Sequence, residues 1–180
     1  ELRKSIDVVK TELKTYNSVE AVTTSNSLPS NISSSTLVRL KEEDDDSKNI
    51  AIYKNTIDYE YLDVFGHELL AGSNFSPEII NNKQNVIINE SAAKAFGWTP
   101  EEAIGNQFYR VGQDYLTVVG VIKDFHMFSM HLAIQPLMMT FRHSSYFNYA
   151  SIKVGADNIQ RTIGLIEESI QQHSNYPFEF

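Results

Sequence analysis

The sequence predicts an α+β fold organised as two lobes, and three observations support this prediction. The chain has 180 residues, of which 42% are hydrophobic, and this is typical of a globular protein with one domain or two small lobes. Helix and strand patterns alternate at both ends of the chain, whereas the middle shows hairpins and short helices. We therefore expect one α/β lobe built from residues 1–54 and 136–180, with a β-rich lobe of residues 55–135 inserted between them.

Charge and composition exclude several classes of protein. The chain has 15 Lys and Arg against 23 Asp and Glu, and this acidic balance argues against nucleic-acid binding, which needs a basic patch. The absence of cysteine excludes disulfide-stabilised folds, thiolate zinc sites and cysteine nucleophiles. No apolar run reaches the about 18 residues that a membrane-spanning helix needs. Because the chain starts without methionine inside a helical pattern and stops in an extended one, we expect a domain of a larger protein.

The first part of the chain predicts a helix followed by three strands. Residues 2–16 place apolar side chains at alternating spacings of four and three, which is one face of a helix. Residues 19–25, 36–41 and 50–57 predict strands. The consecutive acidic residues 42–46 are expected to form the solvated tip of a hairpin between the second and third strands. Calcium binding is the alternative, but consecutive carboxylates lack the alternating ligand spacing of a calcium loop.

Glycines mark the ends of two predicted helices in the middle of the chain. Residues 59–65 predict a short helix that ends at Gly66, and residues 90–96 predict another that ends at Gly97. Between them, residues 85–89 form a brief apolar run that predicts a strand.

A third short helix and a hairpin follow. Thr99 and Pro100 are residue types that begin a helix. Residues 107–111 and 115–122 predict the two strands of a hairpin. The second of these strands is apolar almost throughout, so we expect both its faces to be covered. Gly120 within it predicts a bulge or a close approach of another backbone segment.

The end of the chain predicts a strand over residues 150–154, then a helix, and an extended segment after Pro177. Isoleucines line one face of this helix: Ile159, Ile163, Ile166 and Ile170.

Several polar residues are candidates for chemistry: His67, Glu90, Glu101, Glu102, Asp124, His126 and His131. Asp124, His126 and His131 form the one cluster that could ligate a metal, which leaves a metal-dependent hydrolase open as an alternative. Paired zinc histidines usually lie four residues apart on a helix, whereas His126 and His131 are five apart. The sequence also lacks a serine-hydrolase elbow, a Walker loop and a dinucleotide-binding glycine motif. We therefore expect structural or capping roles and predict no enzyme activity, no cofactor and no catalytic, cofactor-binding or metal-binding residue.

Residues 123–143 contain the most apolar stretch of the chain and all four of its methionines. Two interpretations stay open, because both require the same residue types. The stretch is either core that joins the two lobes, or adaptable apolar surface for a partner or an apolar substrate.

Five blocks of residues occur in a characteristic order: Val86–Ala93, Phe96–Trp98, Ala103–Gly105, Val118–His126 and Ile134–Leu137. Together they resemble the periplasmic core domain of MacB/FtsX-like ABC-transporter permeases. The final segment Pro177–Phe180 is similar to the extended segment that leads back to the membrane in this family.

This resemblance implies a porter-like α/β lobe and a β-containing lobe called Sabre, in a periplasmic domain of an inner-membrane permease. It implies that the domain binds substrate or partner and relays ATP-driven motion, without catalysis, for export or for lipoprotein or peptide handling. The implied partners are the transmembrane helices of the same permease, a cytoplasmic ABC ATPase, a second permease copy, and an adaptor, lipoprotein or peptide. No nucleic acid is expected among them. A free-standing ligand-sensing ectodomain of similar build is the remaining alternative.

Overall fold

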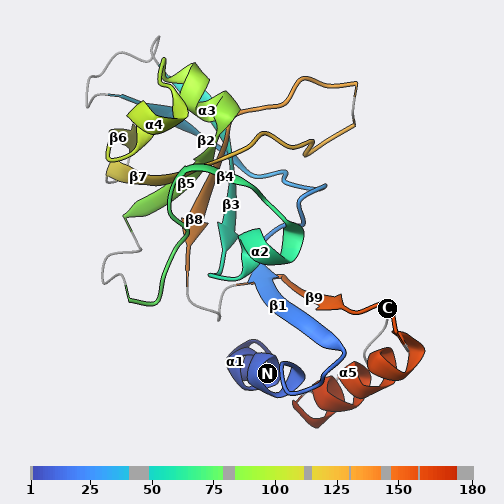
Figure 1. Cartoon of the computed structure of the whole chain (residues 1–180). Helices are drawn as coiled ribbons and strands as arrows, with labels where there is room; N and C mark the ends of the chain where they lie inside the picture. Colours follow the sequence, from blue (N-terminus) through green and yellow to red (C-terminus); the bar gives the residue numbers. More distant parts are fainter. Residues whose placement is uncertain are drawn as a thin grey trace.

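The helices and strands were located in a computed structural model that describes residues 2–40, 49–78, 84–111, 115–129, 131–142, 147–157 and 159–173. The helices are α1 (Leu2–Leu13), α2 (Tyr61–Phe65), α3 (Glu90–Ala95), α4 (Pro100–Ala103) and α5 (Ile159–His173). The strands are β1 (Val19–Ser25), β2 (Ser35–Arg39), β3 (Ile50–Ile57), β4 (Leu69–Gly72), β5 (Asn85–Asn89), β6 (Gln107–Arg110), β7 (Tyr115–Ile122), β8 (Leu137–Phe141) and β9 (Tyr149–Val154). The chain has the predicted α+β fold, with one long helix toward each end (Figure 1).

Six of the strands form a closed, mixed barrel. Their hydrogen-bonded order is β2-β6-β7-β5-β8-β3, and β3 pairs in turn with β2, which closes the ring. The pairs β3–β8 and β5–β7 are parallel and the other neighbours are antiparallel. Closure pairs the strand edges that an open sheet would leave exposed. Outside the ring, β4 pairs with β7, and β1 joins the end of β3 and carries β9.

All six barrel strands bury one face inside the barrel, and β5 and β8 are buried on the other face as well. Each of the six contributes to one core cluster, which therefore fills the barrel interior: Val38, Ile52, Val86, Phe108, Val118 and Met138. The neighbouring residues Ile87 and Met139 point the other way, into a second cluster beneath α2. Burial on both faces explains why β5 and β8 are continuous apolar runs without alternation.

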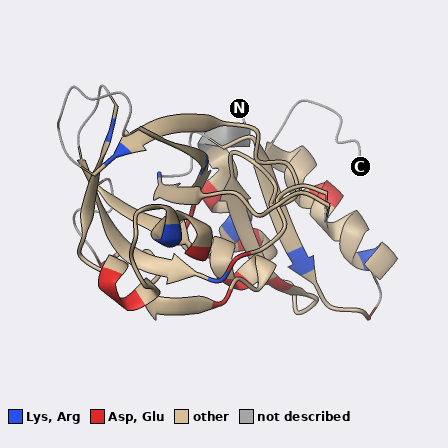
Figure 2. Cartoon of the chain, turned by 90° about the horizontal axis from the view of Figure 1, so that it is seen from above, with Lys and Arg blue, Asp and Glu red and all other residues tan. Residues whose placement is uncertain are grey.

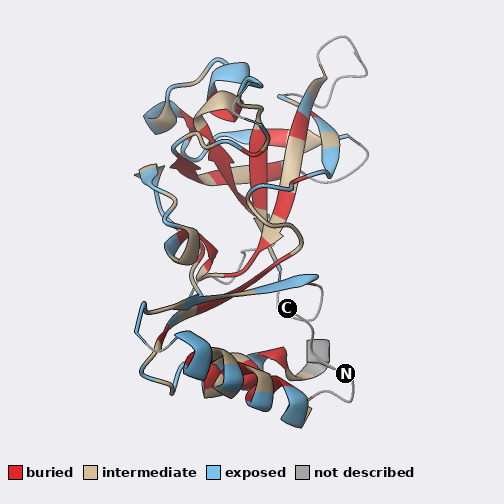
Figure 3. Ribbon diagram, turned by 90° about the vertical axis from the view of Figure 1, so that its right-hand side faces the viewer, coloured by how far each residue is buried: buried red, intermediate tan, exposed pale blue. Residues whose placement is uncertain are grey.

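A third core lies between the terminal helices and the ribbon of β1 and β9. Helices α1 and α5 pack on each other and on this ribbon, and Figure 3 shows the buried segments along the faces that meet. Its buried members are Val9, Leu13, Val19, Val22, Ile166 and Ile170. Segments from both ends of the chain therefore share one core. The sheet continues from this ribbon into the barrel. The division into two lobes therefore stays a prediction, with residues 1–54 and 136–180 in one lobe and residues 55–135 in the other.

Local sequence signals located the short helices. Helix α2 ends at Gly66, whose φ is 67°, as predicted from the tolerance of glycine for the left-handed conformation. Helix α4 begins with Pro100 after the N-cap Thr99, whose side chain forms a capping box with Glu102.

Some elements differ from the prediction. Helix α1 ends at Leu13 and not at residue 16. On the isoleucine face of α5, Ile166 and Ile170 are buried, whereas Ile159 is 45% exposed. Strand β4 has four residues, too few for a periodicity, and was not predicted. The acidic run 42–46 lies outside the described residues, although the hairpin of β2 and β3 that flanks it is confirmed.

Gly120 lies at both a bulge and a close backbone approach. The register between β5 and β7 shifts between Val86 and Ile87, and Ile87 pairs with Gly120. A Cβ atom on Gly120 would lie 2.6 Å from the carbonyl oxygen of Ser73. Both features predicted from a glycine within this strand are confirmed.

Candidate functional site

The strongest polar contact between the terminal helices and the barrel is centred on Asp58, which lies between β3 and α2. Lys10 of α1 donates from Nζ to Asp58 Oδ2 at 2.7 Å. The side chains of Lys10 and Asp58 are only 11% and 7% exposed, so this is a buried ion pair. We call the contacts of Lys10, Lys14, Thr23, Thr24, Asp58 and Glu60 the α1 joint. Figure 2 shows where the charged residues lie along the ribbon.

The Asp58 carboxylate binds three parts of the chain at once. Besides Lys10, Oδ2 accepts from the backbone N–H of Thr24 at 2.7 Å and from its hydroxyl at 2.8 Å. The other oxygen, Oδ1, accepts from the hydroxyl of Thr23 and from the backbone N–H of Glu60 at 3.2 Å. Helix α1, strand β1 and the turn before α2 therefore meet on one side chain.

Glu60 forms the outer half of the joint. Its carboxylate accepts from Lys10 at 2.9 Å and from Lys14 at 2.8 Å. Burial lowers the pKa of Lys10, but the facing carboxylates of Asp58 and Glu60 outweigh burial and the pKa is raised. Burial raises the pKa of Glu60, but hydrogen bonds from Lys14 and Lys10 outweigh it and the pKa is lowered. Lys10 and Glu60 are therefore charged at neutral pH.

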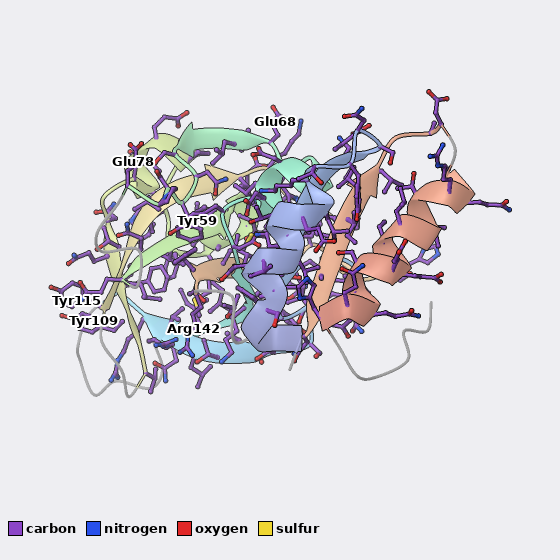
Figure 4. All side chains as sticks on the ribbon, turned by 90° about the horizontal axis from the view of Figure 1, so that it is seen from below. Tyr59, Glu68, Glu78, Tyr109, Tyr115 and Arg142 are labelled. Carbon is purple, nitrogen blue, oxygen red and sulfur yellow. The ribbon has the colours of Figure 1, made fainter. Side chains whose placement is uncertain are left out.

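The turn that carries Asp58 is also fastened to the barrel. Tyr59 stacks on Phe141 at the end of β8, with ring centroids 4.3 Å apart, and its carbonyl oxygen accepts from Asn74 Nδ2 at 2.9 Å. Tyr59 and Arg142 both lie on the barrel side of α1 in Figure 4. The turn therefore has firm contacts on the side opposite α1.

Sequence patterns did not identify this joint. Asp58 is separated from Lys10 by 48 residues, and between a strand and a helix it looks like an ordinary turn residue. The available signal was Lys10 and Lys14, which lie one helical turn apart beside the apolar stripe of α1.

Two of the candidate polar residues, Glu90 and Asp124, have structural roles at the start of α3, and Asp124 caps this helix. Asp124 accepts from the backbone N–H of Ser91 at 3.0 Å and from its hydroxyl at 2.6 Å. The backbone N–H of Asp124 donates to Glu90 at 3.0 Å. Asn89, the N-cap of α3, accepts from the N–H of Leu137 at 2.8 Å. The start of α3 therefore holds both ends of the connection between β7 and β8.

The three residues of the alternative metal cluster do not come together. His126 and His131 are both exposed, and Asp124 is engaged with α3. Among the residues that the structure describes, no three His, Asp or Glu side chains converge to hold a metal ion. The hydrolase alternative needs Asp124, His126 and His131 to converge on one metal ion, and these three side chains do not converge. The chain between His126 and His131 is irregular, so their spacing does not direct the two side chains to a common point.

The apolar stretch 123–143 is divided between core and surface. Met127 and Leu137–Met139 are at most 1% exposed and belong to the core. Leu132 is 57% exposed, and Met130 lies outside the described residues.

The remaining candidates Glu101 and Glu102 are exposed in the first turn of α4, where Glu102 completes the capping box.

His67 is half-buried among aromatic rings. Its ring centroid lies 4.3 Å from that of Phe125 and 5.6 Å from that of Tyr61, and its Nε2 atom is buried without a hydrogen-bond partner in the described part of the chain. Burial in this apolar environment lowers the pKa of His67 to about 4.

We expect His67 to make the domain sensitive to acid. The unfolded chain takes up a proton near pH 6.5, whereas folded His67 resists protonation down to about 4, so stability falls as the pH falls through this interval. The loss should reach about 3 kcal/mol at pH 4, because one pKa unit corresponds to about 1.4 kcal/mol. Urea unfolding of wild type and His67→Phe at pH 7 and pH 4.5 measures this effect. Equal pH dependence of the two proteins would contradict the assignment.

No helix in the described ranges combines the length and the apolar character that crossing a membrane requires. A comparison with curated proteins found no significant match. The model of the MacB-like periplasmic core domain family matches residues 3–168.

Solved structures show the same fold. The periplasmic region of MacB from Actinobacillus actinomycetemcomitans is 17% identical with a TM-score of 0.66, over 93% of this chain and 73% of that one. The extracellular domain of YknZ, a noncanonic ABC-type transporter from Gram-positive bacteria, is 21% identical with a TM-score of 0.66, over 93% and 82%. With a family match over most of its length, the chain belongs to the MacB-like periplasmic core domains of ABC-type permeases.

Proposed function

We propose that this domain relays motion in an ABC-type permease: ATP-driven movement of the transmembrane helices enters through α1 and α5 and passes to the barrel. The observation that carries this proposal is the α1 joint, in which Asp58 links helix α1 and strand β1 to the turn fastened on the barrel. Membership of the family favours this function over that of a free-standing ligand-sensing ectodomain.

The arrangement of the first and last elements supports this proposal. Helices α1 and α5 pack side by side in one core although they stand at opposite ends of the sequence. A displacement of segments that flank the domain would therefore act on a single layer. That layer meets the barrel at the ends of β1 and β3, where Ser25 pairs with Ile57.

The proposed partners follow from the family. They are the transmembrane helices of the same permease, its cytoplasmic ABC ATPase and a second permease copy, with the domain in the periplasm. A periplasmic adaptor, a lipoprotein or a peptide is proposed as the molecule that the barrel engages.

The relay predicts that nucleotide binding changes the distance between the barrels of the two permease copies. The domain has no cysteine, so Leu37→Cys on β2, where Leu37 is 45% exposed, gives one spin label per domain once cysteines elsewhere in the complex are replaced. We expect ATP with vanadate to shift the inter-copy distance in the complete permease–ATPase complex. The control is an ATPase variant that cannot bind nucleotide. An unchanged distance would refute the relay.

A further inference from the structure

We propose that Asp58 is the positioning residue that makes α1, β1 and the barrel move as one unit. This inference rests on the proposed relay and deepens it, because it names the side chain through which the motion passes. The Asp58 carboxylate joins the terminal helix α1 to both strand β1 and the turn fastened on the barrel.

The hydrogen bonding of Asp58 makes the contact rigid. A carboxylate offers about four lone-pair positions. Here five donors share them: Lys10 Nζ, the backbone N–H and the hydroxyl of Thr24, the hydroxyl of Thr23 and the N–H of Glu60. A carboxylate that is 7% exposed and bonded on all sides cannot exchange one partner for water without a cost in free energy.

The backbone alone makes a narrow connection between the ribbon and the barrel. The β1–β3 pairing has one register pair, Ser25 and Ile57. Two backbone bonds support it, from the N–H of Asn26 to the carbonyl oxygen of Thr56 at 2.9 Å and from the N–H of Asp58 to that of Thr24 at 3.2 Å. A connection of this width at a strand end allows bending. The Asp58 contacts lie beside it, on the side toward α1, and restrict that bending.

The outer pair cannot replace Asp58. The side chains of Lys14 and Glu60 are 43% and 31% exposed, so water and salt screen their attraction. Lys10 contacts both carboxylates, but that of Asp58 is 7% exposed and that of Glu60 is 31% exposed, so its attraction to Asp58 is the less screened of the two. The inner pair therefore sets the position of α1.

The test uses the double variant Lys10→Met with Asp58→Asn, which removes both charges, keeps the side-chain volumes and leaves no unpaired buried charge. Spin labels at Val8→Cys on α1 and Leu37→Cys on β2 report the position of α1 relative to the barrel, at side chains that are 56% and 45% exposed. We expect one narrow distance distribution in the complete permease–ATPase complex with native Lys10 and Asp58. The double variant should lose this narrow distribution and the ATP-driven shift between the barrels.

Three controls separate positioning from general stability. Lys14→Met should leave the distribution narrow. Ile52→Val, inside the barrel, weakens the fold without touching the joint and should also leave it narrow. A label pair within the barrel, Leu37→Cys on β2 with Tyr115→Cys on β7, should report the same distance in all variants.

Two results would overturn the inference. One is a double variant that keeps both the narrow α1–barrel distribution and the ATP-driven shift. The other is broadening of the within-barrel pair to the same extent, which indicates loosening of the whole fold. If ATP does not shift the distance between the barrels in the native complex, the proposed relay of motion is wrong. The width of the α1–barrel distance distribution then still tests whether Asp58 positions α1.

Discussion

Replacing Lys10 by methionine is expected to lower the free energy of unfolding by about 3–5 kcal/mol, the usual result of removing one partner from a buried ion pair. Methionine keeps most of the volume of the lysine stem but leaves the buried carboxylate of Asp58, which is 7% exposed, without its cation. The hydroxyls of Thr23 and Thr24 still donate to it, but they carry no charge. Urea unfolding followed by circular dichroism at pH 7 measures the effect.

Lys14 provides the matched control, because it directly follows the last residue of α1 and contacts the same Glu60, while its side chain is 43% exposed. Lys14→Met should cost about 0–1 kcal/mol, as exposed ion pairs do. Adding Asp58→Asn to Lys10→Met should recover part of the loss, because the unpaired charge is then gone. Equal losses for Lys10→Met and Lys14→Met would show that the inner pair is not the dominant contact.

Replacing Gly72 by alanine is the second substitution with a large expected effect. Gly72 has a φ of 76°, where residues with a Cβ atom lose about 1–2 kcal/mol. A Cβ atom here would also lie 2.1 Å from the carbonyl oxygen of Val119 and 2.7 Å from Cδ1 of Ile104. Because the oxygen belongs to the backbone of β7, relief requires movement of β4 against β7, and overpacking of this kind costs about 1–3 kcal/mol more. The expected total is about 2–5 kcal/mol in denaturant unfolding.

Gly97 isolates the conformational part of this cost. Its φ is 80°, close to that of Gly72, but no atom lies within 4 Å of a Cβ built there. Gly97→Ala should therefore lose only the about 1–2 kcal/mol of the left-handed backbone. If Gly72→Ala and Gly97→Ala lowered the free energy of unfolding equally, the close packing around Gly72 would contribute nothing to the cost.

Much of the fold could be predicted from the sequence wherever a signal is local. The Thr99–Glu102 capping box and the glycine that ends α2 act over three or four residues, and both were located correctly. Gly120 indicated its bulge because a glycine weakens the interior of a strand and is typical there of a bulge or a close backbone approach. A structural or capping role was likewise expected for Asp124, because the spacing of its cluster does not suit a metal site, and Asp124 caps α3.

The metal alternative shows what local patterns leave open. His126 and His131 are close in sequence, but spacing fixes side-chain geometry only within a regular helix or strand. The connection that carries them is irregular, and it leaves both exposed. Composition likewise could not divide residues 123–143 into core and surface, because both parts are apolar. Only the burial of each side chain in the folded chain distinguishes them.

By itself, the sequence determined the α+β class, most helices and strands, and the family, because periodicity, caps and ordered motif blocks are properties of neighbouring residues. Only the tertiary structure decided that six strands close into a barrel and that Lys10 meets Asp58. Both depend on pairings between residues tens of positions apart, which hydrophobic burial selects among many alternatives and which no local pattern encodes. The candidate site belongs to this second group, since its ion pair exists only where the terminal helices and the barrel come together.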